Sequence, residues 1–370
     1  MTDQTNQLEA VAMSGGVDSS VAALLRVRDG ARIVGLTMKL WDSECDGPSA
    51  DRACCTADHA SDARRVCQKL SSPHYTLDLR QDFRRDVVDV FVSEYLSGRT
   101  PNPCVRCNTY LKWDALWNRA RELGCSSLVT GHYARIQDTP DGPGLFRAAD
   151  LAKDQSYFLW GIPRPLLART RFPLSDLAKP EIRRLAEEAG LPTAAKRESQ
   201  DICFVPGGDY RTLVRASRPH DPLLSPGPIL GPGGRQLGNH EGLAGYTIGQ
   251  RRGVKAAWTE PLYVTEIDVA ANILRLGTRE ELLVDRLEVG EINLLSRIPV
   301  EEPVGIQVRY RSEPTPGRVA VTGGEMSISL PTPILAPAAG QSIVLYDGPR
   351  LIGGGVLKNA FRTNRRMEAP

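Results

Sequence analysis

The sequence lacks an export signal at its start and any apolar run long enough to cross a membrane. Its first ten residues, MTDQTNQLEA, contain neither the basic stretch nor the apolar core of a secretory signal peptide. No uninterrupted apolar segment approaches the roughly 18 residues that a membrane helix needs. We therefore predict a soluble, cytoplasmic protein with no membrane partner.

Charge of one sign is also scarce. The net charge is only +2, and 24% charged with 41% hydrophobic residues argues against wholesale disorder. This balance gives no direct sign of nucleic-acid binding, but several short basic clusters could still line one phosphate-binding groove. These clusters are Arg64-Arg65, Arg84-Arg85, Lys196-Arg197, Arg251-Arg252, Arg309 with Arg311, and Arg362 with Arg365-Arg366.

Disulfide and zinc-finger patterns are missing too, although the chain contains eight cysteines. A chain with no export signal is not expected to hold a disulfide scaffold. No second C-x-x-C or histidine pair stands at zinc-finger spacing from Cys104 and Cys107. Five further cysteines have no ligand-like spacing, so we interpret them as buried or incidental thiols: Cys45, Cys54, Cys55, Cys67 and Cys125.

The first half of the chain alternates between strand and helix patterns. Residues 8–13 (LEAVAM) are typical of a short buried strand, and an apolar-periodic helix over 19–29 ends at Gly30. Alternation of this kind implies a parallel sheet covered by helices on both faces. The expected strands are 8–13, 33–38, 75–79 and 128–130; the expected helices are 19–29, 56–70, 81–97 and one that follows the Pro-rich loop 100–107 and ends at 123.

The pattern changes near residue 200. Residues 221–245 are dense in Gly and Pro and indicate loops and turns throughout. From about residue 260 short alternating runs dominate, which favours a small β-barrel or sandwich. The runs are LYVTEI, ILRLG, IQVRY, RVAVT, MSISL, SIVLY and LIGGGVL. The predicted architecture is an α/β domain, a short middle domain and a β domain.

The segment SGGVDSS (14–20) joins the first expected strand to the first expected helix. Two glycines let the backbone approach a bound group, and the helix start presents free N–H groups and a positive dipole end, which suits phosphate oxygens. It is not a Walker A motif, because no lysine follows the glycines. It resembles the PP-loop of ATP pyrophosphatases, which cleave ATP between the α- and β-phosphates. That resemblance places Asp18 near the pyrophosphate, acting through Mg²⁺.

The segment PNPCVRCN (101–108) holds a C-x-x-C on a loop that leads into a helix. Cys107 is expected at or next to the helix N-terminus, where the dipole favours the reactive thiolate, and Arg106 adds positive charge. Half of a zinc site or a redox pair are the alternatives. Cys203, in ESQDICF (198–204), is on its own more typical of a buried thiol.

Together these motifs resemble the tRNA-specific 2-thiouridylases (MnmA/TrmU). The chain matches that family in its PP-loop, in the PNPxxxCN segment and in further segments spread from about residue 10 to 360. The further segments are GHYAR (131–135), KDQSY (153–157), ICF (202–204), GYTIGQRRG (245–253), RYR (309–311) and GGG (353–355).

The resemblance implies a fold and a reaction. The fold is a parallel-sheet PP-loop domain (adenine nucleotide α-hydrolase-like) over residues 1–203, a small central domain over 204–278 and a C-terminal β-barrel over 279–366. The reaction is ATP-dependent adenylation of O2 of the wobble uridine, U34, and its replacement by sulfur, which releases AMP and pyrophosphate. The implied partners are the anticodon stem-loop of tRNA and a protein that donates persulfide or sulfide.

Residue roles also follow from the resemblance. Cys107 corresponds to the catalytic nucleophile, Cys203 to the carrier of the persulfide, and Asp18 to the catalytic loop carboxylate. The residues implied around ATP are Ala12, Met13, Ser14, Gly15, Gly16, Val17, Asp18, Ser19, Met38 and Gly131. Those implied against tRNA, with 102–104 on the target base, are Asn102, Pro103, Cys104, His132, Lys153, Asp154, Gln155, Arg309, Tyr310, Arg311 and Gln341.

Cys104 departs from the family pattern, because many members have Asp at this position. Related tRNA thiolases with a C-x-x-C and a distant Cys bind a [4Fe–4S] cluster with one open iron, and three thiolates can ligate such a cluster. We therefore expect a cluster on Cys104, Cys107 and Cys203, with a cluster-free persulfide relay as the alternative.

Two other functions fit parts of the sequence. Another PP-loop enzyme, such as an amidating synthetase, would share SGGVDSS but would not need the C-x-x-C, the distant Cys203 or the segments that face tRNA. A non-catalytic RNA-binding protein could hold a structural metal at the cysteines. Release of pyrophosphate with and without tRNA separates these possibilities.

Overall fold

The computed structural model describes residues 7–41, 57–196, 202–205, 208–254, 256–299 and 302–363. The chain forms two compact units: unit 1 comprises residues 1–88, 103–208 and 349–351, and unit 2 comprises residues 89–102, 209–348 and 352–370. The expected three-domain boundaries stay a prediction. Several residues named above lie outside the described residues: Cys45, Cys54, Cys55, Arg197, Arg365 and Arg366.

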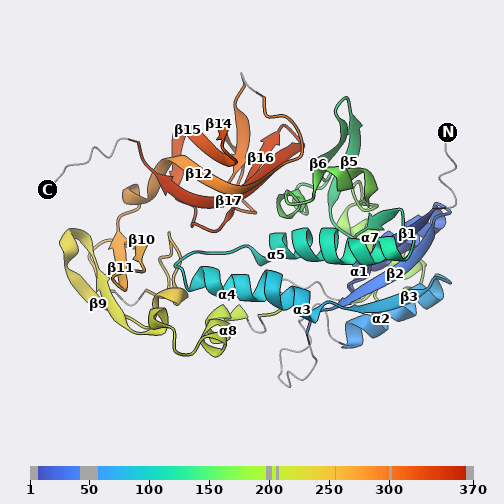
Figure 1. Ribbon diagram of the computed structural model, residues 1–370, viewed down its shortest axis with the longest axis horizontal. Helices are drawn as coiled ribbons and strands as arrows, with labels where there is room; N and C mark the ends of the chain where they lie inside the picture. The colour runs from blue at the N-terminus through green and yellow to red at the C-terminus, as the bar shows by residue number, and fades with distance from the viewer. Residues whose placement is uncertain are drawn as a thin grey trace. The chain divides into compact units, whose positions relative to one another are not determined.

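Unit 1 is built on the parallel sheet that the alternating pattern predicts (Figure 1). Val11, which has no exposed surface, pairs with Gly35 on one side and Val129 on the other. Strands buried in this way read as continuous apolar runs, which explains the segment LEAVA. The sheet order is β3-β2-β1-β4-β7, with β1 (Leu8–Ala12), β2 (Arg32–Lys39), β3 (His74–Asp78), β4 (Ser127–Val129) and β7 (Thr170–Arg171).

Helices α1 (Val17–Arg28), α2 (Ala57–Lys69) and α7 (Lys179–Glu188) complete the core of unit 1. Helices α1 and α2 contact β2, and α7 contacts α1. Val21, Val66 and Ile182 come from the three helices and are fully buried in one hydrophobic cluster. Within the described residues, no helix is both long enough and apolar enough to cross a membrane.

Residues 103–122 form one continuous helix whose middle has the wide turns of a π-helix. It runs through α5 (Pro103–Arg106), the π-helical segment η4 (Cys107–Leu116) and α6 (Trp117–Glu122). A second helix of the same mixed kind comprises α3 (Arg80–Phe83), the π-helical segment η3 (Arg84–Val88) and α4 (Asp89–Tyr95). The π-helix is rare and occurs often at functional sites.

An antiparallel hairpin that the sequence patterns did not reveal follows β4. It consists of β5 (Ala134–Thr139) and β6 (Gly142–Arg147). Residues 349–351 complete this part of unit 1, because Arg350 and Leu351 pair with Phe146 and Leu145 of β6. A segment near the end of the chain thus adds a strand to the first half of the chain.

The middle part of unit 2 contains a sheet in the order β10-β11-β8-β9. Its strands are β10 (Tyr263–Asp268), β11 (Ile273–Gly277), β8 (Gly227–Leu230) and β9 (Gln236–His240). The expectation of loops throughout 221–245 was therefore wrong. Ile229 is fully buried and anchors β8, whereas Gly233 and Gly234, both with positive φ, form only the turn between β8 and β9.

The C-terminal part of unit 2 is a closed β-barrel, as predicted (Figure 1). Its strands follow the order β12-β15-β14-β13-β16-β17, and β17 pairs back with β12. The strands are β12 (Leu283–Leu294), β13 (Val304–Gln307), β14 (Thr315–Thr322), β15 (Glu325–Leu335), β16 (Ser342–Asp347) and β17 (Arg350–Phe361). Leu287, Ile328 and Leu345 fill the interior with no exposed surface. Closure removes the free strand edges that an open sheet would present.

Short helices connect these elements. Helix α8 (Tyr210–Ser217) belongs to unit 2, and the stacked rings of Tyr95 and Tyr210, 4.2 Å apart, join α4 to it. The 3₁₀-helical turns are η5 (Ser156–Phe158), η6 (Arg164–Arg169), η8 (Pro222–Leu224), η9 (Pro232–Gly234), η10 (Leu243–Gly245) and η11 (Glu280–Leu282).

Candidate active site

Hydrogen bonds and a close backbone contact hold the loop between β1 and α1. Gly15 has a φ of +70°, and a Cβ at this position would overlap the carbonyl oxygen of His59. The hydroxyls of Ser19 and Ser20 donate to the Gly16 carbonyl at 3.0 and 2.8 Å, and the backbone N–H of Ser14 donates to Ser19 Oγ at 3.3 Å. Glycine is thus required at Gly15, and the serines hold the loop against the first turn of α1.

Gly131 lies against the start of the same helix. A Cβ at this residue would lie 2.7 Å from the backbone nitrogen of Ser19 and 2.7 Å from the carbonyl carbon of Asp18. Only glycine permits this approach of the segment after β4 to α1. The two segments that the sequence assigned to ATP, residues 12–19 and Gly131, are therefore in contact.

Asp18 is held by two residues that the sequence analysis did not single out. Lys179 Nζ lies 2.7 and 2.9 Å from the two carboxylate oxygens, and the Tyr133 hydroxyl donates to Oδ1 at 2.8 Å. The Lys179 ammonium also lies 5.8 Å from the centre of the Tyr133 ring. Asp18 therefore forms an ion pair with Lys179, which lies 161 residues later in the chain, and it also accepts a hydrogen bond from the Tyr133 hydroxyl.

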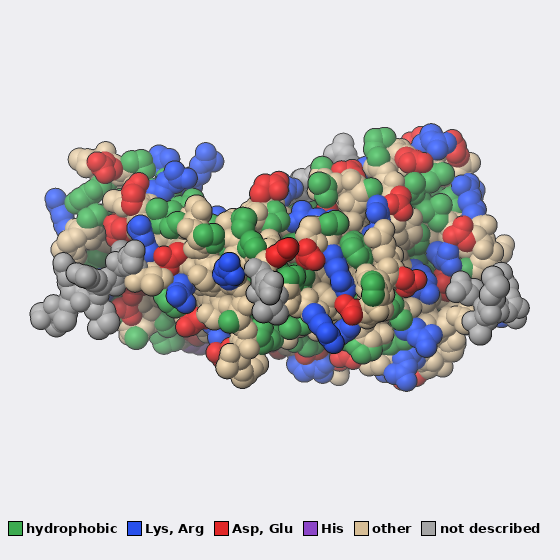
Figure 2. Space-filling view, turned by 90° about the horizontal axis from the view of Figure 1, so that it is seen from above, with side chains coloured by type: hydrophobic (Ala, Val, Ile, Leu, Met, Phe, Trp, Pro, Cys, Tyr) green, Lys and Arg blue, Asp and Glu red, His purple; other side chains and the backbone are tan. Residues whose placement is uncertain are grey.

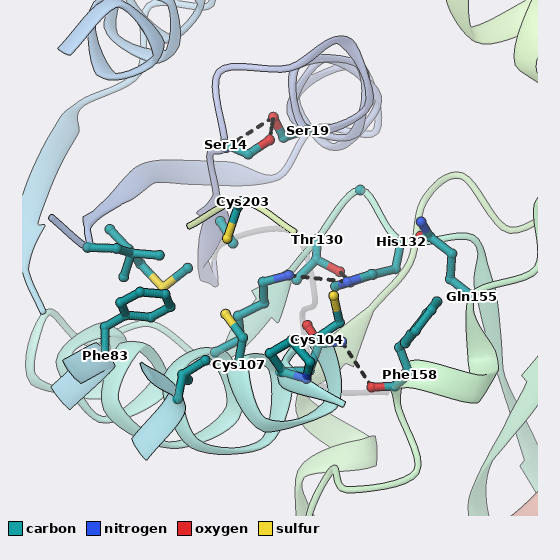
Figure 3. Close-up of a pocket in the computed structure, with 18 of the residues that line it drawn as sticks. Ser14, Ser19, Phe83, Cys104, Cys107, Thr130, His132, Gln155, Phe158 and Cys203 are labelled. Carbon is teal, nitrogen blue, oxygen red and sulfur yellow. Dashed lines mark hydrogen bonds between the residues drawn. The ribbon is translucent and has the colours of Figure 1, made fainter. Parts of the chain in front are cut away.

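A cavity of about 370 Å³ in unit 1 begins at this loop and reaches the cysteines (Figure 3). One part of its wall is apolar and includes Leu36, Met38, Leu40 and Phe83. The predicted site residues in the wall are Ala12, Met13, Ser14, Asp18, Ser19, Met38, Pro103, Cys104, Cys107, Gly131, His132, Gln155 and Cys203. Apolar surface with a few placed polar groups is typical of a small-molecule site.

All three thiols predicted to act together line this one cavity. Cys104 and Cys107 come from the helix that begins at Pro103, and Cys203 comes from a separate segment. Figure 3 shows the side chains of Cys107 and Cys203 directed into the cavity from these two segments. Cys104 is exposed, whereas Cys107 and Cys203 are partly buried. Cys67 and Cys125 are buried elsewhere, and burial raises the pKa of each thiol to about 11.

The helix around Cys107 differs from the expectation. Because the helix begins at Pro103, Cys104 lies in its first turn and Cys107 lies about one turn further along. The helix dipole acts within the first turn, so it favours a thiolate at Cys104 more than at Cys107. Arg106 Nε donates to the Asp86 carbonyl at 2.7 Å, and the guanidinium lies over the Tyr110 ring. The Asp86 carbonyl and the Tyr110 ring thus hold the Arg106 guanidinium, and its expected effect on the Cys107 thiolate stays a prediction.

The expected cluster ligands do not form a metal-binding group. In the described ranges, no three His, Cys, Asp or Glu side chains lie close enough together to hold one metal ion. That geometry concerns a single ion, whereas a [4Fe–4S] cluster binds each thiolate to a different iron, so its three cysteines need only line one space, as these three do. The cluster stays a prediction.

His132 lies inside a hydrogen-bonded chain at the cavity wall. Its Nε2 is 3.2 Å from Lys112 Nζ, and its Nδ1 is 2.7 Å from Thr130 Oγ1. Burial, together with the neighbouring Lys112 charge, lowers the pKa of His132 well below its usual value. Since an ammonium can only donate, Nε2 accepts from Lys112 and the ring proton resides on Nδ1, which donates to Thr130. The imidazole therefore holds the Lys112 ammonium at the cavity.

Lys153 is partly buried, and the side chains of Asp154 and Gln155 accept hydrogen bonds from different backbone N–H groups. The Asp154 carboxylate is buried and accepts from the backbone N–H groups of Ala148 and Ser156 at 3.0 and 3.2 Å. Burial raises the pKa of Asp154 above its ordinary value. Gln155 Oε1 accepts from the Tyr133 N–H at 3.1 Å and lines the cavity. A direct contact of Asp154 with tRNA stays a prediction. Its hydrogen bonds to Ala148 and Ser156 hold the turn that contains Lys153 and Gln155.

The remaining predicted tRNA residues belong to unit 2. Arg309 and Arg311 are exposed, and Gln307 Nε2 donates to the carbonyl of Tyr310 at 2.7 Å. Gln341 Nε2 donates to the Thr100 carbonyl at 2.8 Å, which fixes the loop just before Asn102. Figure 2 shows basic and acidic side chains mixed over one face of the molecule, as the small net charge implies.

Three protein-family models match successive parts of the chain. They are described as a tRNA methyl transferase HUP domain over residues 8–207, a tRNA methyl transferase PRC-barrel domain over 223–278 and an aminomethyltransferase beta-barrel domain over 284–357. The first of these models covers more than half of the chain.

Curated relatives match almost the whole chain under one name, tRNA-specific 2-thiouridylase MnmA. The relative from Magnetococcus marinus is 44% identical and is matched over 94% of this chain and 98% of its own length. The one from Chloroflexus aggregans is 45% identical (93% and 96%), and the one from Geobacter metallireducens is 42% identical (98% and 99%). Identity of 42–45% over more than nine tenths of both chains, together with the family model over residues 8–207, shows that the chain belongs to the tRNA-specific 2-thiouridylase family.

Proposed function

We propose that this chain is an ATP-dependent tRNA sulfurtransferase that converts uridine 34 to 2-thiouridine. One observation carries the proposal: a single cavity contains the nucleotide-loop residues Ser14 and Ser19 together with the thiols of Cys107 and Cys203. Exchange of a carbonyl oxygen for sulfur needs activation by ATP and a sulfur nucleophile at one carbon atom. Holding both groups in one space makes the two steps intramolecular.

The first step is adenylation of the base. The uridine O2 attacks the α-phosphorus of ATP, the bond to the β-phosphate oxygen breaks, and pyrophosphate leaves. Met38 and Leu36 supply apolar surface for the adenine, and the N–H groups and serine hydroxyls after β1 face the phosphates. The target base must be extruded from the anticodon stack to enter the cavity.

The second step delivers sulfur. The outer sulfur of a persulfide on Cys203 attacks C2, and AMP leaves with the original oxygen. The Cys107 thiolate then attacks the Cys203 sulfur, which frees 2-thiouridine and leaves a Cys107–Cys203 disulfide for an external thiol to reduce. Their position on one cavity wall supports a reaction between the two cysteines.

Mg²⁺ fits the same site. Asp18 is a carboxylate in the cavity wall beside the nucleotide loop, and Mg²⁺ is usually held by one or two carboxylates together with substrate phosphates. When bound, the ion supplies positive charge that stabilises the leaving pyrophosphate.

The cluster expected from the sequence and the persulfide relay are two routes for the same sulfur transfer. Cys104, Cys107 and Cys203 supply the three thiolates that a cluster would need, and the relay needs only Cys107 and Cys203, all of which line one cavity. The sulfur donor is proposed to be a protein that transfers the outer sulfur of its own persulfide to the Cys203 thiolate in the relay, or that supplies sulfide to the cluster in the other route. The cytoplasm is the proposed location.

For tRNA docking, we propose that Lys153, Arg309 and Arg311 contact the phosphate backbone. Phosphates dominate the affinity of nucleic-acid complexes and make it salt-dependent. Asn102 to Cys104 face the target base in this proposal, since Pro103 and Cys104 line the cavity.

The other functions receive less support. The matched domain models are described as methyl transferase domains, but the relatives are named thiouridylases, and the cavity thiols favour sulfur transfer over methyl transfer. An amidating synthetase would have no use for these thiols, and a purely structural RNA-binding role would not need the nucleotide loop beside them.

The test uses the full chain, ATP with Mg²⁺, a tRNA transcript that contains U34 and a persulfide donor, under anaerobic conditions. We expect tRNA-dependent release of pyrophosphate and one 2-thiouridine per tRNA, measured by nucleoside mass spectrometry. A transcript with C34 and the variant Asp18→Ala serve as controls, and neither should yield product. Pyrophosphate release that ignores tRNA, with no thiouridine formed, would contradict the proposal.

Iron analysis of the same preparations separates the relay from the cluster. If the relay operates, the iron-free parent is fully active and Cys104→Ala retains much of its activity, whereas Cys107→Ala and Cys203→Ala are inactive. If a cluster operates, activity follows iron and sulfide content, and all three alanine variants lose both.

A further inference from the structure

Lys179 occupies an unusual place for a lysine. It is the first residue of α7 and is only 8% exposed. Ile182 and Ala186, three and seven residues later, share its side of the helix and are buried in the core of unit 1. A lysine at the end of an apolar stripe loses its hydration, so its charge must be matched by a partner. Asp18 is the residue that matches this charge.

The partner is the carboxylate at the nucleotide loop. The Lys179 ammonium reaches both oxygens of Asp18, at 2.7 and 2.9 Å, and Tyr133 donates to the same carboxylate at 2.8 Å. Asp18 lies in the first turn of α1 and lines the cavity. Because α7 packs on α1, the positive charge of Lys179 lies at the start of α1, the helix end proposed to face the phosphates.

The nucleotide loop needs such a charge. The segment SGGVDSS contains one carboxylate and no cation. The negative charge of Asp18 by itself repels the phosphates that the loop is built to bind. Phosphate-binding loops of the Walker type carry a lysine within the loop that reaches the β- and γ-phosphates. Here the chain supplies an ammonium group at the loop from a helix far downstream.

We propose that Lys179 binds the β- and γ-phosphates of ATP and stabilises the pyrophosphate as it leaves. This inference rests on the proposed function, because it needs ATP in the cavity. As the bond from O2 to the α-phosphorus forms and the bond from the α-phosphorus to the β-phosphate oxygen breaks, the electron pair stays on that oxygen. Lys179 neutralises this developing charge. Asp18 and Tyr133 hold the ammonium in position when the site is empty.

The test is calorimetric titration of the full chain with pyrophosphate alone and with AMP alone, without tRNA or divalent metal. We expect Lys179→Gln to weaken pyrophosphate binding roughly 10- to 100-fold, as the loss of a charge-assisted bond implies. AMP, which lacks the β- and γ-phosphates, should bind within about twofold of the parent. Lys179→Arg keeps the charge and should retain most of the pyrophosphate affinity.

A double variant removes the main ambiguity. Lys179→Gln alone leaves the Asp18 charge unmatched, which could weaken pyrophosphate binding or folding by itself. In Asp18→Asn/Lys179→Gln the pair is neutral and can still hydrogen bond, so folding is protected. If Lys179 contacts phosphate, pyrophosphate binding stays weak in the double variant. If Lys179 only neutralises Asp18, the affinity returns to that of the parent, and the proposal is overturned.

Lys196→Gln is the matched control, because Lys196 Nζ forms a comparable ion pair with Asp62 at 2.6 Å in unit 1, and Asp62, unlike Asp18, does not line the cavity. It should bind both ligands as the parent does. Equal losses of AMP and pyrophosphate binding in Lys179→Gln and in the double variant would indicate a structural role and overturn the proposal. A parent that binds neither ligand contradicts the nucleotide site itself, and with it the proposed function. A parent that binds both, with the Lys179 variants unchanged, contradicts only the assignment of Lys179.

Discussion

Lys153 and Asp154 are neighbours in the chain with opposite environments. Lys153 is only partly buried, whereas the Asp154 carboxylate is buried and accepts two backbone N–H groups. We expect Lys153→Gln to weaken tRNA binding, to flatten the salt dependence by about one unit and to leave stability unchanged. Asp154→Ala should instead lower the free energy of unfolding by about 1–3 kcal/mol, because two buried donors lose their acceptor.

Filter-binding titrations at several salt concentrations and urea unfolding of both variants check this pair. The salt slope should respond to Lys153 and stability to Asp154. A stable Asp154→Ala variant with a changed salt slope would show that the carboxylate meets the RNA directly.

His132 should make stability depend on pH. Burial and the Lys112 charge lower its pKa well below the ordinary value near 6.5. Between the folded and the unfolded pKa, the unfolded chain binds a proton that the folded chain does not, so stability falls as the pH falls below about 6.5. The contribution is at most about 1.4 kcal/mol per pH unit for one histidine.

The measurement is urea unfolding of the parent and of His132→Asn between pH 7.5 and 5.5. His74 and His240, whose pKa values burial also lowers, contribute equally in both proteins. The difference in slope therefore reports His132, and identical slopes would mean that His132 is not buried in neutral form.

Single residues also mark the limit of prediction from sequence. Ser14, Asp18 and Ser19 could be placed at a phosphate site because a loop and the helix after it form one local motif. Lys179 could not be paired with Asp18, since nothing within α7 indicates which distant carboxylate its ammonium will meet. Lys112 was missed for the same reason. The contacts of Lys179 with Asp18 and of Lys112 with His132 join distant parts of the chain, and a single sequence does not predict such contacts.

At the scale of elements, the π-helical segment η4 has a consequence for Cys107. Its wide turns bring residues five apart onto one face, so Cys107 and Lys112 both line the cavity. His132 fixes the Lys112 ammonium there. Since the helix dipole acts mainly on the first turn, we infer that Lys112 favours the Cys107 thiolate.

We therefore expect Lys112→Met to raise the pKa of the Cys107 thiol, because a neighbouring positive charge is removed. The rate of alkylation of Cys107 against pH, followed by peptide mass spectrometry, gives this pKa. Lys69→Met, which removes an exposed lysine of α2, is the control and should leave it unchanged. The same alkylation profile in all three proteins would rule Lys112 out as the source of activation.

Elements with a strong local pattern were predicted well. The strands at 8–13, 33–38 and 75–79 are β1, β2 and β3. β1 and β2 are apolar because they are buried in a parallel sheet, whereas β3 is a partly exposed edge strand. The hairpin of β5 and β6 was missed, and its strand β6 pairs with Arg350 and Leu351, about 200 residues later in the chain. β12 was missed because its charged outward side chains dilute the apolar alternation. Nothing local distinguished π-helical from α-helical turns in η4.

At the scale of the whole molecule, the chain passes between its units more than once. Residues 89–102 lie inside the sequence of unit 1 but belong to unit 2, and residues 349–351 do the reverse. We expect a fragment of residues 1–208 to fold poorly, because Phe91, Val92 and Tyr95 would lose the surroundings that bury them and β6 would lose its partner.

Dye binding to exposed apolar surface and thermal unfolding by circular dichroism check this expectation against the full chain. The fragment should bind more dye and unfold at a lower temperature. A fragment as stable as the full chain would show that the exchanged segments contribute little to either unit.

The pairing of β6 with residues 349–351 also sets the order of events during synthesis. A ribosome that adds 5–20 residues per second makes the strand partner roughly 10–40 s after β6, because about 200 residues separate them. Throughout that interval the nascent hairpin has an unpaired edge, which is a template for wrong strand pairing. The nucleotide-binding half is thus translated early, but the edge of its β6 strand stays unpaired until Arg350 and Leu351 have been made.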